Sequence, residues 1–179
     1  MVQSEEDIRH ETLVSVARKM MLAARTAPKA RGFDNLQIKM VEGDELAVMA
    51  DIMRRAAIEN PAKAFMARDA ANMESAGVAV LVGTKNSVMG LNCGYCGFPT
   101  CALKNSESQN TPCAFNSHDL GIAVGSAVSV AADNRVDNRV MFSVGVAAME
   151  AGLMDESSMV MGIPISVSGK SPFFDRQPH

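Results

Sequence analysis

The sequence has 179 residues, of which 47% are hydrophobic and 21% are charged, a composition that excludes wholesale disorder and is typical of one globular domain. Its net charge is −3 and no basic stretch is dense enough to follow a phosphate backbone, so we expect no nucleic-acid partner. The longest apolar run, residues 121–132, is too short to cross a bilayer, and the acidic start of the chain is unlike a secretion signal. We therefore expect a cytoplasmic protein without membrane association.

Helical and strand patterns alternate along the first half of the chain. Apolar residues recur at helical spacing after a capping serine and predict a helix over about 4–25. The alternating stretch "NLQIKMV", residues 35–41, predicts a half-buried strand. Helical patterns follow over about 44–60 and about 61–75, the second with proline at its first position. The continuous apolar run "GVAVLVGT", residues 77–84, predicts a central strand.

The second half adds two helices, one strand and a long connection. The helices are predicted to begin near Ser117 and near Asp137, and residues 158–167 predict the last strand. Residues 85–116 show no convincing helix or strand, whereas ordinary connections have about 4–6 residues. We therefore predict a single α/β domain over residues 1–179, with a small mixed sheet flanked by helices and an inserted cysteine-rich loop over 85–116.

All four cysteines of the chain, Cys93, Cys96, Cys101 and Cys113, lie in this loop. In a reducing cytosol, a cysteine cluster is more often a metal or redox site than a set of disulfides. Iron–sulfur clusters are held by four thiolates, and here three closely spaced cysteines would wrap the cluster while the distant fourth completes the site. Glycines between the cysteines let the backbone approach the sulfur atoms. The spacing favours an iron–sulfur cluster, with one-electron transfer as the function.

A structural zinc site is the main competing interpretation. Zinc sites built from four cysteines usually contain two short knuckles, each with two to four residues between its cysteines. Only Cys93 and Cys96 form such a knuckle, because eleven residues separate Cys101 from Cys113. A zinc-stapled interaction domain therefore stays open as the non-redox alternative, and disulfides come last.

The cysteine motif also resembles a known family. The stretches "CGYCGFPTCA" and "TPCAF" resemble the four-cysteine motif of an uncharacterised bacterial and archaeal family of proteins containing a ferredoxin domain, and "AARTAPKARG" and "SPFFDR" extend the resemblance. The motif is similar, more loosely, to [4Fe–4S] segments of corrinoid iron–sulfur proteins. The resemblance implies a [4Fe–4S] cluster on Cys93, Cys96, Cys101 and Cys113, and it brings no established reaction with it.

A second resemblance concerns the scaffold. The stretch "AARTAPKARGFDNLQ" resembles the part of flavin-dependent nitroreductases in which a proline turn leads into an Asn-x-Gln strand. The stretches "VGVAAMEAGL" and "MVMGIPI" resemble a helix and the final strand of that fold. This resemblance implies a nitroreductase-like fold, a homodimer by analogy, and FMN near Lys29, Asn35 and Gln37. A flavin-assisted oxidoreductase that receives electrons from the cluster is therefore an alternative function; neither its catalytic residues nor the redox partner protein can be assigned from the sequence.

Overall fold

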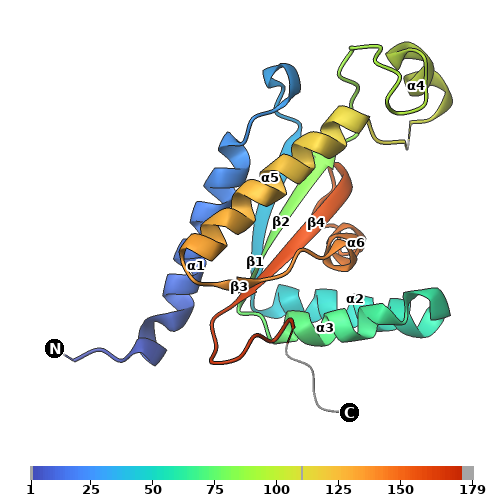
Figure 1. Ribbon diagram of the computed structural model, residues 1–179. Helices are drawn as coiled ribbons and strands as arrows, with labels where there is room; N and C mark the ends of the chain where they lie inside the picture. Colours follow the sequence, from blue (N-terminus) through green and yellow to red (C-terminus); the bar gives the residue numbers. More distant parts are fainter. Residues whose placement is uncertain (1, 110, 175–179) are drawn as a thin grey trace.

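The computed structural model describes residues 2–109 and 111–174, which form three layers, with a sheet between two groups of helices (Figure 1). Helices α1 (Glu5–Thr26) and α5 (Ala114–Asp133) cover one face of the sheet. Helices α2 (Asp44–Glu59), α3 (Phe65–Glu74) and α6 (Phe142–Glu150) cover the other face. The predicted α/β architecture, with a small sheet flanked by helices, is confirmed.

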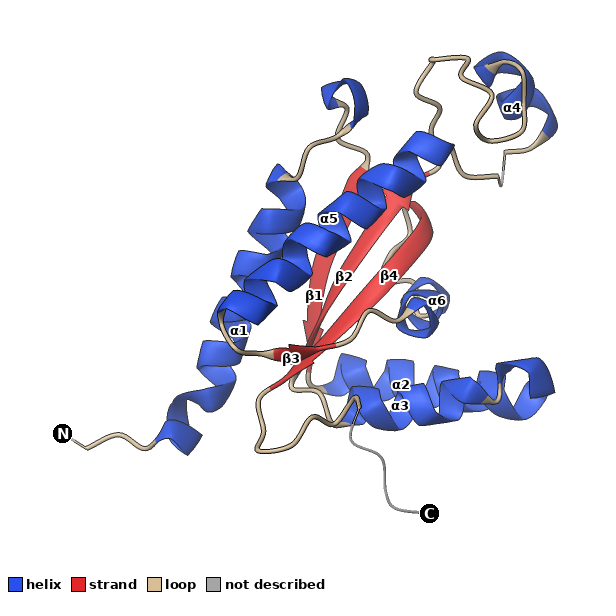
Figure 2. Cartoon of the chain, viewed as in Figure 1, coloured by secondary structure: helices blue, strands red, loops and turns tan. Residues whose placement is uncertain are grey.

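The sheet has four strands in the order β1-β2-β4-β3 (Figure 2). Its members are β1 (Leu36–Glu42), β2 (Val78–Lys85), β3 (Asp137–Asn138) and β4 (Ser157–Ser166). Every pair of neighbouring strands in the described residues is antiparallel, so the mixed sheet of the prediction is corrected to an antiparallel one. Consecutive strands are joined through helices, and β2 and β3 run in the same direction because each is antiparallel to β4, which lies between them.

The central strand divides its side chains between two hydrophobic cores. Val78, Val80 and Val82 of β2 pack against α1 and α5, whereas Ala79 and Leu81 pack against the helices of the opposite layer. Successive side chains of a strand point to opposite faces, so a strand that is buried on both faces needs a continuous apolar run. This confirms the central strand predicted from residues 77–84.

The predicted helices agree with the structure except near their ends. The helix predicted over 4–25 is α1. Ser4 caps its N-terminus in a capping box, in which the side chains of Ser4 and Asp7 each accept a hydrogen bond from the backbone N–H of the other residue. Helix α5 begins at Ala114, three residues before the predicted start at Ser117. The helix predicted from Asp137 begins only at Phe142, because Asp137 and its neighbour pair with β4 as the short strand β3.

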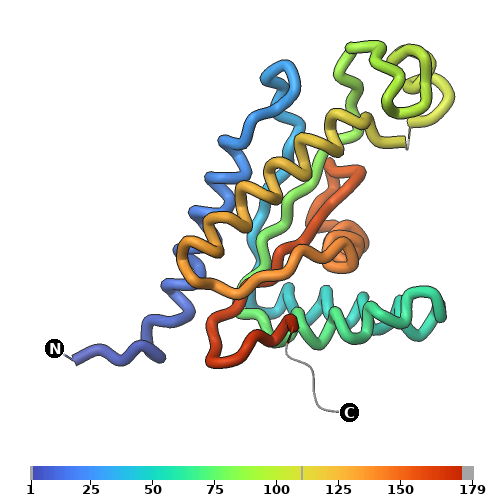
Figure 3. Tube along the Cα trace, in the orientation of Figure 1, coloured from blue at the N-terminus to red at the C-terminus, as the bar shows by residue number. Residues whose placement is uncertain are grey.

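The cysteine-rich segment lies at the end of the sheet where β2 ends, β1 begins and α5 begins. Figure 3 shows it at the opposite end of the molecule from the start of α1. It contains one helix that was not predicted, α4 (Cys101–Glu107), which Thr100 caps by accepting a hydrogen bond from the backbone N–H of Leu103. A helix this short is marginal by itself, so the folded surroundings must stabilise it.

No helix in residues 2–109 or 111–174 combines the length and the apolar character that a membrane span requires.

We expect Gly145→Ala to destabilise the protein by about 1–3 kcal/mol, because a Cβ at Gly145 in α6 would lie 1.9 Å from the carbonyl oxygen of Val160 in β4. Gly125→Ala is the matched control, since Gly125 is an exposed helical glycine with nothing within 4 Å of its added Cβ. Alanine favours both helices intrinsically, so Gly125→Ala should instead stabilise the fold by up to about 1 kcal/mol. Urea unfolding measures both changes, and equal effects would contradict this close packing of α6 on β4.

Candidate metal centre

The cysteine-rich segment leaves the sheet at a junction held by two asparagine side chains. Asn116, in the first turn of α5, is buried, and its Nδ2 donates to the carbonyl oxygens of Ser87 at 2.7 Å and Lys85 at 3.3 Å. Its Oδ1 accepts a hydrogen bond of 3.1 Å from Nδ2 of Asn35, which directly precedes β1. A buried amide that is hydrogen-bonded in several directions holds its partners in one arrangement. The junction therefore fixes the start of the segment relative to the sheet.

A second attachment comes from the turn that follows α1. Nη1 of Arg31 donates to the carbonyl oxygen of Met89 at 2.6 Å, and the side chain of Met89 is buried. The turn is itself attached to α5, because the N–H of Ala30 donates to both carboxylate oxygens of Asp119, at 3.0 and 3.1 Å. The stretch "AARTAPKARG" thus has a structural role, which is to hold the cysteine-rich segment in place.

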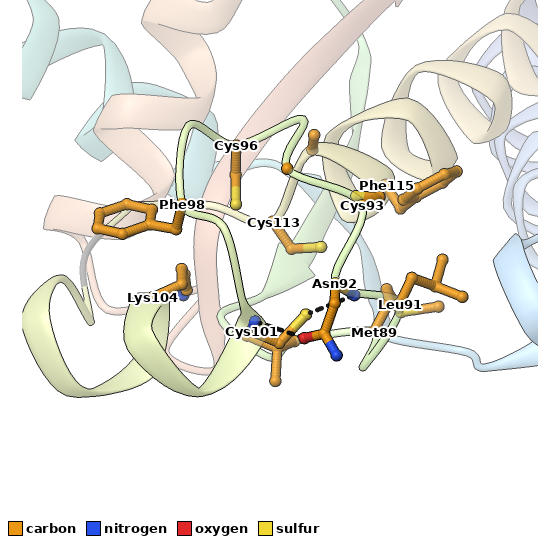
Figure 4. A pocket seen from close by; sticks show the side chains of 13 residues that line it. Met89, Leu91, Asn92, Cys93, Cys96, Phe98, Cys101, Lys104, Cys113 and Phe115 are labelled. Atoms are coloured by element: carbon orange, nitrogen blue, oxygen red, sulfur yellow. Dashed lines mark hydrogen bonds between the residues drawn. The ribbon is translucent and has the colours of Figure 1, made fainter.

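Within the segment, Asn92 joins the first part of the loop to the start of α4. Its Oδ1 accepts from the N–H of Cys101 at 2.8 Å, and its own N–H donates to Sγ of Cys101 at 3.4 Å (Figure 4). Gly94 and Gly97 both have positive φ, a conformation that only glycine adopts without strain. The loop between the cysteines therefore turns tightly, and a backbone N–H already points at one sulfur atom.

All four cysteines line the same pocket. Figure 4 shows the thiol groups of Cys96, Cys101 and Cys113 turned toward the space between them. Cys113 is buried, Cys96 and Cys101 are half-buried, and Cys93 is exposed. None of them forms a disulfide. The structure thus brings together the complete set of predicted ligands, in a site that is closed on the side of Cys113 and open on the side of Cys93.

The start of α5 favours negative charge in this pocket. Cys113 is the N-terminal capping residue of α5, a helix of 20 residues, so its thiol lies beside the positive end of the helix dipole. Thiolates are the metal-binding form of cysteine, and any cluster held by four of them is anionic. The site therefore has the donor set and the local potential that such a group requires.

A single metal ion needs its thiol ligands closer together than an iron–sulfur cluster does. Among the residues that the structure describes, no three His, Cys, Asp or Glu side chains are gathered closely enough to hold a single ion. Sulfur atoms around a zinc ion at about 2.3 Å would lie about 3.8 Å from one another. A cluster of several iron and sulfide atoms is wider than one ion and is held by thiolates that stand further apart.

Three residues of the site were not predicted from the sequence. Asn92 and Asn116 form hydrogen bonds that depend on contacts between distant segments, which no local pattern indicates. Lys104 also lines the pocket and is 1% exposed. The sequence contained one indication that Lys104 belongs to the site. Lys104 follows Cys101 by three residues, and residues three apart lie on the same face of a helix.

The predicted flavin-binding residues all form hydrogen bonds within the chain. Nζ of Lys29 donates to the carbonyl oxygen of Ala27 at 2.9 Å, after the end of α1. Nε2 of Gln37, the second residue of β1, donates to Oδ1 of Asp155 at 3.1 Å, in the connection that precedes β4. Asn35 belongs to the junction described above. Asn35 is therefore the one member of the set that also connects to the cysteine-rich segment.

An ion pair stabilises the turn that leads from α1 into β1. Nη1 of Arg25 lies 2.7 Å from Oδ2 of Asp34, and it also donates to the carbonyl oxygen of Leu36 at 3.0 Å. Partial burial acts to raise the pKa of Asp34, but the hydrogen bonds from Arg25 and from the N–H of Leu36 outweigh it, so this pKa lies below its ordinary value. The carboxylate thus stays ionised and paired at neutral pH.

Comparisons with known proteins place the chain in a family. Residues 109–176, which include Cys113, match the family described as "Uncharacterized protein containing a ferredoxin domain". An uncharacterized protein of the archaeon Archaeoglobus fulgidus is 40% identical over 185 residues, covering 99% of each chain. The chain belongs to this ferredoxin-domain family. The family's ferredoxin domain indicates an iron–sulfur redox function.

Solved structures show that the fold is shared with nitroreductases. A nitroreductase with bound FMN from Bacteroides fragilis superposes with a TM-score of 0.60 at 9% identity, covering 92% of this chain and 82% of the other. A BluB-like flavoprotein from Clostridium difficile superposes with a TM-score of 0.56 at 18% identity, covering 92% and 85%. The predicted nitroreductase-like scaffold is confirmed. At such low identity the likeness concerns the fold alone.

We expect Asn116→Ala to destabilise the protein by about 2–3 kcal/mol, because it leaves the amide of Asn35 and the carbonyl oxygen of Ser87 without their buried partner. Hydrogen exchange in the segment after β2 should become faster than in the wild type. Asn105→Ala is the control, since Asn105 is exposed on α4, and its effect should stay within about 0.5 kcal/mol. If unfolding and hydrogen exchange were the same in both variants, the junction would not hold the segment.

Proposed function

We propose that this protein binds a [4Fe–4S] cluster through Cys93, Cys96, Cys101 and Cys113 and transfers single electrons. The observation that carries the proposal is that all four cysteines, which lie in one segment, line one pocket. The ferredoxin domain of the family supports the same class of group. The cysteine spacing supports a cluster over zinc, because Cys93 and Cys96 form one short knuckle and eleven residues separate Cys101 from Cys113.

The chain's own residues would hold and insulate the cluster asymmetrically. Cys113 would anchor it on the buried side, against the start of α5, while exposed Cys93 would leave one edge open to a redox partner protein. The N–H of Asn92, which already donates to Cys101, would stabilise a thiolate there and influence the reduction potential. When bound, the cluster supplies a centre that accepts one electron and returns one electron without making or breaking a bond in the protein.

Purification under argon, followed by iron, acid-labile sulfide and zinc analysis, tests this proposal. We expect about four iron and about four sulfide atoms per chain, with broad visible absorption that dithionite bleaches. Cys113→Ser should lose most of the iron and sulfide, whereas Ser106→Ala, in α4 of the same segment, should keep both. One zinc ion per chain without sulfide would instead indicate the zinc-stapled interaction domain.

A second candidate is a flavin-assisted oxidoreductase, which is favoured by the shared fold with a nitroreductase that holds FMN. In that case the cluster would pass electrons singly from a donor protein to FMN near Lys29, Asn35 and Gln37. Added FMN should then bind with quenching of its fluorescence, and Lys29→Ala should weaken this binding. Arg18→Ala is the control, because Arg18 is an exposed residue of α1 that lies eight residues before the end of the helix. Protein that neither contains flavin nor takes up FMN would contradict the candidate.

A further inference from the structure

A buried lysine lies in the pocket of the four cysteines. Lys104 of α4 is 1% exposed, and its side chain lines the same pocket as Cys93, Cys96, Cys101 and Cys113 (Figure 4). Lysine is almost never fully buried unless its charge has a partner, because the ammonium group loses its hydration. Lys104 therefore requires an explanation that ordinary packing does not provide.

The described residues offer this ammonium group only one neutral partner. Nζ of Lys104 donates to Oδ1 of Asn86 at 3.0 Å, and no ion pair within residues 2–109 and 111–174 includes Lys104. Exposed Lys85, by contrast, pairs with Glu156 at the surface. Burial without a carboxylate is costly unless another negative charge occupies the site.

The position of Lys104 in α4 brings it beside a proposed ligand. Cys101 is the first residue of α4 and Lys104 follows three residues later, so both side chains lie on the same face of this helix. Asn86, which directly follows β2, accepts the hydrogen bond that fixes the end of the lysine side chain. The backbone of α4 and the hydrogen bond to Asn86 thus fix the two ends of the lysine side chain. This side chain lines the pocket in which four thiolates would place their negative charge.

We propose that Lys104 is the built-in counter-charge of the cluster and raises its reduction potential. This inference rests on the proposed [4Fe–4S] function. Reduction adds one electron to a group that is already anionic, so a fixed positive charge nearby stabilises the reduced form more than the oxidised form. Lys104 is a positioning residue, because it acts on the potential and takes no part in bonding to iron. Its burial makes the effect stronger than that of a lysine in water.

The test is the midpoint potential of Lys104→Met, measured by a redox titration that is followed by electron paramagnetic resonance. Methionine keeps a long unbranched side chain and removes the charge. We expect the iron and sulfide content to be retained and the potential to fall. At a fixed solution potential, the ratio of reduced to oxidised cluster should fall about tenfold, which corresponds to about 59 mV for a one-electron couple. Lys63→Met, at an exposed lysine of another layer, should leave the potential unchanged.

A second variant tests the same charge without changing the lysine. Asn86→Asp places a carboxylate at the hydrogen-bond partner of Nζ, which would neutralise the ammonium locally and lower the potential as Lys104→Met does. Asn105→Asp is the matched control, because it adds the same charge on an exposed neighbouring residue that does not bond to Lys104, and its shift should be smaller. Because Asn86 is exposed, this variant remains informative if Lys104→Met fails to fold.

The two proposals fail in different ways. A wild-type protein without iron and sulfide would remove the proposed function. A wild-type protein with a complete cluster, whose potential is unchanged in Lys104→Met and equally shifted by Asn86→Asp and Asn105→Asp, would overturn the role of Lys104 and leave the proposed function intact.

Discussion

The buried amide of Asn116 is the interaction on which the site depends most. It connects the end of β2, the residue before β1 and the first turn of α5 through hydrogen bonds to Lys85, Ser87 and Asn35. A long connection between a strand and a helix has many conformations, and ordering it costs entropy. The junction offsets part of this cost at the base of the segment, and the bond from Arg31 to Met89 constrains it further along. These hydrogen bonds therefore order the base of the segment that contains the four cysteines.

The charge of the proposed cluster is a second constraint on the pocket of the four cysteines. The net charge of the chain is negative, so an anionic group needs local compensation. Two features would supply it in the proposed site, namely the positive end of the α5 dipole at Cys113 and the buried Lys104. Lys104 and Cys113 both line the same pocket, whereas most of the described ion pairs lie at the surface, where water weakens them. A site with this potential favours thiolates and an anionic cluster.

The shared fold indicates how the chain is built, whereas the cysteine site indicates what the chain could bind. The three-layer arrangement resembles flavoproteins, but that likeness describes how helices cover a sheet and does not assign a reaction. The cysteine-rich segment is attached at one end of the sheet and adds a separate set of ligands to this scaffold. Asn35 links the two parts, because it precedes β1 and bonds to Asn116 at the base of the segment. A flavin and a cluster, if both bind, would therefore share one structural support.

Local sequence patterns were sufficient to predict the main helices and strands and to select the four candidate ligands. Helix α1 and the central strand β2 have strong periodic or continuous apolar patterns, and cysteines are rare enough that four in one loop indicate a site. Local patterns failed where a tertiary contact determined the conformation. Strand β3 exists because Asp137 pairs with β4, and the short helix α4 is stabilised by bonds from Thr100 and Asn92.

The sequence by itself determined the class of fold and which thiols could share one centre, because helix periodicity, strand runs and cysteine spacing are properties of neighbouring residues. Only the tertiary structure decided how the segment that contains those thiols is held and which buried residues line the same pocket. Asn116 and Lys104 look like ordinary surface residues in the sequence, and they become part of the site because packing buries them against segments that are distant along the chain. A buried amide or ammonium group costs free energy unless it finds a partner, because burial removes the water that would otherwise form hydrogen bonds with it.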